Sequence, residues 1–96
     1  MAIQSFAKME LKEFFETGRV PKNARWQGLK KIVARKIDML DYASILNDLK
    51  SPPGNHLEAL EGNLKGWHSI RVNDQWRIIF EWTEQGPEQV GIVDYH

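Results

Sequence analysis

The sequence predicts an α+β domain, in which two N-terminal helices pack on an antiparallel sheet of about four to five strands. Three observations carry this prediction. Up to about residue 42 the apolar residues recur every three or four positions, as on one face of a helix. A Ser-Pro-Pro-Gly run at residues 51–54 then stops any helix, and beyond it the apolar residues alternate with polar ones, as in strands. Ninety-six residues make a single domain, residues 1–96.

The N-terminal half is expected to be mainly helical. Residues 2–6 are predicted as a short strand and residues 8–17 as the first helix, which Gly18 would cap at its C-terminal end. Residues 22–42 are predicted as the second and longest helix, and residues 43–49 as a short helical piece. The second helix has a continuous apolar stripe made by Trp26, Leu29, Val33, Ile37 and Leu40.

The C-terminal half is expected to form hairpin-linked strands at residues 56–60, 67–73, 75–82 and 89–95. In the second and third of these strands the even positions are apolar and the odd ones polar. One face of the sheet should therefore be the core and the other should be polar, with the helices covering the apolar face. The even set is Ile70, Val72, Trp76, Ile78, Phe80 and Trp82; the odd set is Ser69, Arg71, Asn73, Gln75 and Arg77.

Composition limits the classes of function. The chain has no cysteine, so disulfides and thiolate metal sites are excluded, and His56, His68 and His96 have no recognised ligand spacing. We therefore expect no metal and no cofactor. No apolar run approaches the roughly 18 residues of a membrane span, and the first ten residues lack the apolar stretch of a signal peptide. A cytoplasmic location without membrane contact is expected.

The charges are segregated although the net charge is zero. Residues 19–36 hold seven basic residues and no acidic one, whereas residues 37–96 hold four basic and ten acidic residues. This block is either a solvated helix face or a surface that meets phosphates or an acidic partner. The candidate partner-contact residues in this block are Lys22, Arg25, Lys30, Lys31 and Arg35.

Two stretches, PGNHLEALEGNLKGWHSIRVNDQWRIIF at residues 53–80 and VGIVDYH at residues 90–96, resemble the HigB toxins, also called plasmid maintenance killer proteins, of the RelE/ParE superfamily. The FFETG at residues 14–18 resembles the first helix of that family, so the resemblance covers roughly half of the chain. It implies a RelE-like microbial RNase fold. It also implies an enzyme that cuts mRNA in the ribosomal A site, without a metal, by driving the ribose 2′-oxygen onto the neighbouring phosphate.

Such chemistry needs a cation at the phosphate, a base for the 2′-hydroxyl and an acid for the leaving 5′-oxygen. Carried over from the family, Arg77 would stabilise the phosphate, Tyr95 and His96 would transfer protons or orient the substrate, and Asp94 would orient one of these two residues. Strand phase puts Tyr95 on the same side as Arg77. The candidate substrate-binding residues are Asn73, Gln75, Lys65, Arg71 and Glu61.

Each assignment has a plainer alternative. Arg77 could be a solvated or salt-bridged strand arginine, and Tyr95 a half-buried sheet aromatic. The sequence also departs from the family pattern, because LEALEGN has Glu61 where many members have lysine and Glu58 where some have histidine. Either change weakens attraction to an anionic substrate. Glu61 as a general base, compensation by Lys65, or weak activity would each be consistent with this change.

The family also implies the partners. The expected ones are a HigA-like helix-turn-helix antitoxin, the 70S ribosome with its mRNA, and operator DNA contacted indirectly through the antitoxin. The competing hypothesis is a non-catalytic interaction module, either a ParE-like toxin that binds a protein target or a co-repressor that acts with its antitoxin. The complete Asp-Tyr-His end together with Arg77 favours the enzyme.

Overall fold

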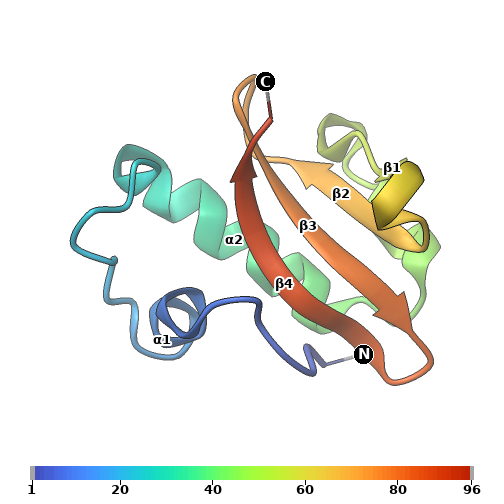
Figure 1. Ribbon diagram of the computed structural model, residues 1–96, viewed down its shortest axis with the longest axis horizontal. Coiled ribbons are helices and arrows are strands. Elements are labelled where there is room, and N and C mark those ends of the chain that lie inside the picture. The colour runs from blue at the N-terminus through green and yellow to red at the C-terminus, as the bar shows by residue number, and fades with distance from the viewer. Residues whose placement is uncertain (1, 96) are drawn as a thin grey trace.

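The computed structural model describes residues 2–95 and has two helices and a four-stranded antiparallel sheet in the order β1-β2-β3-β4 (Figure 1). The predicted α+β architecture is confirmed. The helices are α1 (Met9–Thr17) and α2 (Lys30–Tyr42), and the strands are β1 (Glu58–Ala59), β2 (Trp67–Arg71), β3 (Trp76–Thr83) and β4 (Gly86–Asp94). Short 3-10 turns lie between them at η1 (Gln27–Leu29), η2 (Leu46–Lys50), η3 (Pro53–Asn55) and η4 (Gly62–Leu64).

The first helix ends as its sequence predicts. Gly18 adopts the left-handed conformation, with φ of 80°, and its N–H donates to the carbonyl of Phe14. Only glycine enters this conformation without a steric penalty, so the residue both ends α1 and turns the chain toward the next segment.

The predicted second helix is wrong in its first third, because α2 begins at Lys30 and not near residue 22. Pro21 and Gly28 disfavour a regular helix. Trp26 instead packs into the core, where its ring and that of Phe14 are in edge-to-face contact with 5.0 Å between ring centres. The Leu29 N–H donates to the Trp26 carbonyl in a 3-10 turn. Trp26 and Leu29 are three positions apart, and this spacing of apolar residues fits a 3-10 turn as well as an α-helix. The sequence pattern therefore could not distinguish the two, which explains the error.

Two predicted strands also differ from the structure, since one is absent and the other is shorter than expected. Residues 2–6 form no strand; within them the structure has an isolated parallel bridge between Phe6 and Val90. The predicted strand at residues 56–60 is reduced to Glu58–Ala59, since His56 has a positive φ of 44° and follows a 3-10 turn. Both segments lie at the margins of the sheet, where side-chain packing constrains the backbone least.

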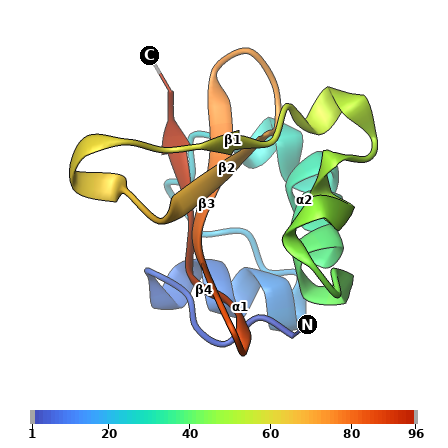
Figure 2. The same ribbon diagram turned by 90° about the vertical axis from the view of Figure 1, so that its right-hand side faces the viewer.

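The core lies between α2 and one face of the sheet, as Figure 2 shows. Ile70 of β2 and Trp76, Ile78 and Phe80 of β3 supply the sheet side, and the helix side comes from Val33, Ile37 and Leu40; all of these are buried. The prediction that the even positions form the core face is therefore confirmed, except that Trp82 is only partly buried. Among residues 2–95 no helix is long and apolar enough to cross a membrane.

Candidate functional site

Arg77 lies in β3, near the middle of the sheet, between Arg71 of β2 and Val93 of β4. The alternation of the strand predicted a solvated polar face at this position. Instead Arg77 is only 6% exposed, and the neighbouring Ser69 is completely buried. This part of the polar face is therefore covered, because the segment before β1 and the C-terminal end of β4 both bring groups onto it.

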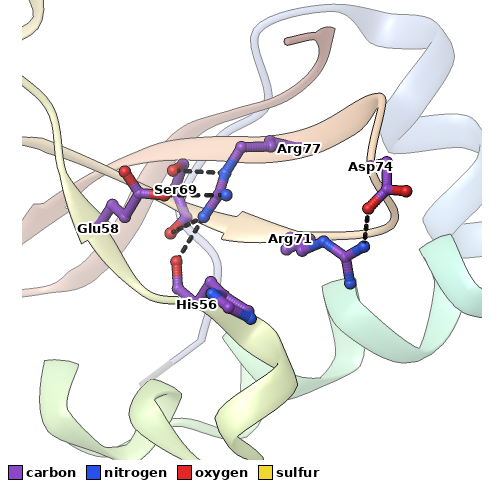
Figure 3. A network of polar contacts seen from close by, with 6 residues as sticks. All are labelled: His56, Glu58, Ser69, Arg71, Asp74 and Arg77. Atoms are coloured by element: carbon purple, nitrogen blue, oxygen red, sulfur yellow. Dashed lines mark hydrogen bonds and ion pairs between the residues drawn. The ribbon is translucent and has the colours of Figure 1, made fainter.

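The guanidinium of Arg77 has a polar partner at each of its nitrogens (Figure 3). Nε donates to the Ser69 hydroxyl at 2.9 Å, Nη2 donates to the backbone carbonyl of His56, and Nη1 lies 3.0 Å from the Glu58 carboxylate. A charge this deeply buried is tolerated only when it is paired in this way. Because the Glu58 side chain is 50% exposed, this carboxylate marks the side of the guanidinium that is nearest to solvent.

Tyr95 stacks over the same guanidinium. The centre of its ring lies 5.2 Å from the Arg77 Cζ, which is the geometry of a cation–π contact. The Tyr95 N–H donates to the Gln75 carbonyl at 2.6 Å, so the ladder between β3 and β4 continues to this residue and holds the ring in place. The predicted approach of Tyr95 to Arg77 is thus confirmed, and Tyr95 remains 46% exposed. His96 lies outside the described residues.

Asp94 connects the C-terminal end of β4 to two other elements. Its carboxylate accepts a hydrogen bond from Gln75 Nε2 at 3.0 Å and pairs with Arg25 at 3.2 Å. Arg25 in turn lies 5.5 Å from the ring centre of Trp76. Gln75 and Arg25, which the sequence assigned to substrate and to partner contact, are therefore held beside the end of β4.

The turn between β2 and β3 contains two more predicted substrate residues. The Asn73 side-chain oxygen accepts hydrogen bonds from the N–H groups of Gln75 and Trp76, at 2.9 and 2.8 Å, which closes the turn. Asn73 therefore has a clear role in shaping the hairpin. Arg71 is paired with the highly exposed Asp74 (Figure 3) and lies directly opposite Arg77.

Glu61 and Lys65 flank η4 and are both exposed. The segment that carries η4 extends away from the sheet, on the side opposite α2 (Figure 2). Neither side chain forms a hydrogen bond or ion pair with any of residues 2–95. The structure thus does not join Glu61 to Arg77, whereas it does join Glu58 to it.

The basic block is exposed at the positions singled out from the sequence, Lys22, Arg25, Lys30, Lys31 and Arg35. Lys36 differs, because it is 6% exposed and its ammonium donates to the side-chain oxygen of Asn55. Burial lowers the pKa of Lys36, and the nearby charges of Arg35 and Arg71 lower it further. Lys36 therefore serves to tie α2 to η3, and the exposed block is smaller than the sequence suggests.

The two histidines among residues 2–95, His56 and His68, are not part of a metal site. The His68 ring stacks on Phe80 with 6.2 Å between ring centres, and burial lowers the His68 pKa. Its Nδ1 is buried and has no hydrogen-bond partner in the described part of the chain. Within residues 2–95, no group of three or more histidine, aspartate or glutamate side chains is arranged to hold a metal ion.

Two residues of the site, Ser69 and Glu58, were absent from the sequence-based list. Both contact Arg77, and they are paired with each other between β1 and β2. The sequence contains one usable signal, namely that Glu58 occupies a position where some HigB toxins have histidine. The pairing itself depends on the register of a two-residue strand, which no local pattern specifies.

Comparisons with known proteins show the family of the chain. Residues 4–96 match the family described as the RelE-like toxin of the type II toxin–antitoxin system HigB. The chain is 60% identical to Toxin HigB-1 of Vibrio cholerae over 50 residues, which cover 52% of this chain and 53%, or about half, of that toxin. It is also 42% identical to an uncharacterized protein of Haemophilus influenzae over 76 residues, 75% of this chain and 70% of that protein.

Two solved toxin structures have a similar fold. The YoeB–YefM complex of Staphylococcus aureus aligns with a TM-score of 0.56 and 18% identity, covering 100% of this chain and 97% of the other. The YoeB/ParE toxin of Agrobacterium tumefaciens aligns with a TM-score of 0.57 and 16% identity over the full length of both chains. At such identities the likeness concerns the fold alone.

Proposed function

Because the chain belongs to the family of HigB, RelE-like toxins of type II toxin–antitoxin systems, we propose that it is an endoribonuclease that cuts mRNA on the ribosome. A HigA-like helix-turn-helix antitoxin would hold it inactive and bring it indirectly to operator DNA. The observation that carries this proposal is the grouping of a cation, a carboxylate and a phenol, namely Arg77, Glu58 and Tyr95, at one place on the sheet.

In the proposed reaction the ribose 2′-oxygen attacks the adjacent phosphorus atom and the bond to the 5′-oxygen breaks. A base takes the 2′-hydroxyl proton, and an acid returns a proton to the departing 5′-oxygen. The Arg77 guanidinium would stabilise the additional negative charge on the phosphate oxygens. Its fixed contacts with Ser69 and His56 support this role, because a cation that is already oriented does not have to reorganise during the reaction.

Glu58 is the carboxylate that we assign as the general base, in preference to Glu61. It lies 3.0 Å from the Arg77 Nη1 on the side nearest to solvent, so a phosphate that binds Arg77 there would leave the Glu58 carboxylate beside the 2′-hydroxyl. Glu61 is not in contact with Arg77. Tyr95, and by family resemblance His96, would supply or orient the proton for the leaving oxygen. Asp94 holds the side chain of Gln75, whose carbonyl accepts the hydrogen bond from Tyr95.

The exposed basic residues of α2 and of the loop that precedes η1 support a second part of the proposal, contact with the ribosome. Lys22, Lys30, Lys31 and Arg35 are exposed and cationic, as required of a surface that meets ribosomal RNA phosphates. This contact would make activity depend on the ribosome and on salt concentration. The residue Arg25 would contribute less, because Asp94 already neutralises it.

The test is cleavage of a reporter mRNA in a reconstituted translation reaction, with the breaks mapped to codons. We expect breaks in translated codons when ribosomes are present and poor cleavage of the same RNA without them. Glu58→Gln should reduce cleavage by about 10²–10⁴-fold if Glu58 is the base, whereas the matched variant Glu61→Gln should change it only a few-fold. Equal cleavage with and without ribosomes would refute the proposed ribosome dependence.

A second candidate is the non-catalytic interaction module. The observation that favours it is that every nitrogen of the Arg77 guanidinium already has a partner within the protein, as a purely structural arginine would. In that case Glu58→Gln and Glu61→Gln would be indistinguishable, and no mRNA breaks would appear at any ribosome concentration. The same translation assay thus separates the two functions.

A further inference from the structure

The link between α2 and η3 is made by two buried polar residues, which we call the Lys36–Asn55 pair. Lys36 of α2 is 6% exposed, and Asn55, the last residue of η3, is completely buried. The Lys36 ammonium donates to the Asn55 side-chain oxygen, and this is the only hydrogen bond that the ammonium forms with residues 2–95. The pair thus joins the helix to the loop that precedes β1.

The pair stabilises the fold less than apolar residues could. Within residues 2–95 the Lys36 ammonium forms no ion pair with a carboxylate. Burial lowers the pKa of Lys36, and the positive charges of Arg35 and Arg71 lower it further. A buried charge whose partner is an uncharged amide loses more hydration than it regains, and a well-packed apolar pair of similar size avoids this loss. Stability alone therefore does not explain the pair.

The amide group of Asn55 also fixes the loop at residues 51–56. Its Nδ2 donates to the Leu49 carbonyl at 3.1 Å and to the Ser51 carbonyl at 3.4 Å. Within residues 51–56 Asn55 is the only buried residue, and the other five are exposed. The Asn55 side chain is consequently the main attachment of this loop to the rest of the protein.

The residue after Asn55 connects this attachment to Arg77. His56 adopts the left-handed conformation, with φ of 44° and ψ of 56°, and its carbonyl accepts a hydrogen bond from Arg77 Nη2 (Figure 3). A residue other than glycine keeps this conformation only where its surroundings enforce it. Glu58, which pairs with Nη1 of the same guanidinium, lies two residues further along. Two partners of Arg77 therefore depend on the position of one short segment.

We propose that the Lys36–Asn55 pair positions Arg77 for the cleavage reaction. It fixes the segment that carries the His56 carbonyl and the Glu58 carboxylate, and it thereby sets the direction in which the guanidinium meets the phosphate. Lys36 and Asn55 are buried away from the substrate, so they act through His56 and are positioning residues. This inference rests on the proposed function, and it adds α2 to the elements that determine the cleavage rate.

Two pair variants separate positioning from folding. Lys36→Met keeps a side chain of similar length and removes the buried charge. The double variant Lys36→Met, Asn55→Leu replaces both polar partners by apolar groups of similar shape, a change that is often nearly neutral for stability. Val33→Ala is the control, because Val33 is a completely buried residue of the same helix and its truncation weakens packing without removing a polar contact to η3.

The first measurement is the NMR signal of the Arg77 guanidinium in the full chain without substrate. In the unchanged chain the contacts of Arg77 should slow rotation about its Nε–Cζ bond. Both pair variants should speed up this rotation by about tenfold, the effect of losing one charge-assisted hydrogen bond, while Val33→Ala should leave it within about twofold. Unchanged rotation in the pair variants would overturn the connection through His56.

The second measurement is cleavage of ribosome-bound mRNA at increasing toxin concentration, at a temperature where every variant is folded. In the pair variants the maximal rate should fall by about 10- to 100-fold, while the half-saturating toxin concentration stays within about threefold, because a misplaced guanidinium affects the chemical step and not binding to the ribosome. Val33→Ala should keep the maximal rate within about twofold of the unchanged chain. A change confined to the half-saturating concentration, or an equal loss of rate in Val33→Ala, would overturn the positioning role.

Failure of this inference and failure of the proposed function give different results. If the unchanged chain cuts no mRNA on ribosomes, the proposed function fails and the positioning role fails with it. If the unchanged chain cuts mRNA and the pair variants cut it equally fast, the positioning role alone fails. Should Lys36→Met not fold, the double variant decides, because it leaves neither member of the pair as a buried polar group without its partner.

Discussion

Replacement of Arg77 by alanine should lower the stability of the fold as well as any cleavage. The change removes charge-assisted hydrogen bonds to the buried Ser69 hydroxyl and the His56 carbonyl, each worth about 1.5–3 kcal/mol in proteins. The ion pair to Glu58 adds little, because Glu58 is half exposed and water screens it. Since such losses are not additive, we expect the free energy of unfolding to fall by about 2–4 kcal/mol.

The assay is equilibrium urea unfolding followed by tryptophan fluorescence, with melting temperatures as a second measure. A loss of about 2–4 kcal/mol in a domain of this size corresponds to a fall in Tm of roughly 10–25 °C. Arg71→Ala is a matched control, because Arg71 lies directly opposite Arg77 but pairs with a highly exposed aspartate. It should cost less than about 1 kcal/mol.

Arg77→Lys separates the effects on folding and chemistry. Lysine keeps the positive charge but cannot donate simultaneously to Ser69, His56 and Glu58 from a planar group. We expect an intermediate loss of stability and a large loss of cleavage when the variant is assayed under conditions where it is folded. If Arg77→Ala unfolds within about 0.5 kcal/mol of the unchanged protein, or no differently from Arg71→Ala, the reasoning from burial is refuted.

Three further predictions concern the site and the sheet. Removal of Tyr95 and His96 should reduce mRNA cleavage by about 10²–10⁴-fold while costing about 1 kcal/mol of stability, because Tyr95 is 46% exposed; near-normal cleavage would exclude these residues from the reaction. Glu61→Lys should increase cleavage, because it replaces a negative charge near the anionic substrate with a positive one. Loss of cleavage in this variant would instead identify Glu61 as a general base. Burial lowers the pKa of His68, so protonation favours the unfolded chain, and stability should fall as pH decreases through about 6.5. His68→Phe should flatten urea-unfolding stability between about pH 7 and pH 5, and an unchanged pH dependence would contradict the assignment.

The broad architecture could be predicted because it depends on local periodicity. Alternation at positions such as Ile70 and Ile78 identified the core face of the sheet, and the spacing of Val33 and Ile37 identified the helix that covers it. The boundary of α2 could not be predicted, since Trp26 keeps helical spacing while it folds into the core through a 3-10 turn. The spacing of apolar residues predicts which side chains are buried, but it does not specify the backbone conformation that buries them.

The candidate site divides in the same way. The sequence by itself determined the family resemblance, the chemical types available near the C-terminus, and the strand phase that puts Tyr95 on the side of Arg77. Only the tertiary structure decided that Arg77 is buried, that Ser69 and Glu58 hold it, and that Glu61 is not in contact with it. The reason is physical: the exposure and partners of a side chain depend on strand register and on segments distant in sequence, such as the two-residue strand β1 pairing with β2. A period-two pattern specifies a face of a sheet, whereas what covers that face is settled when the whole chain packs.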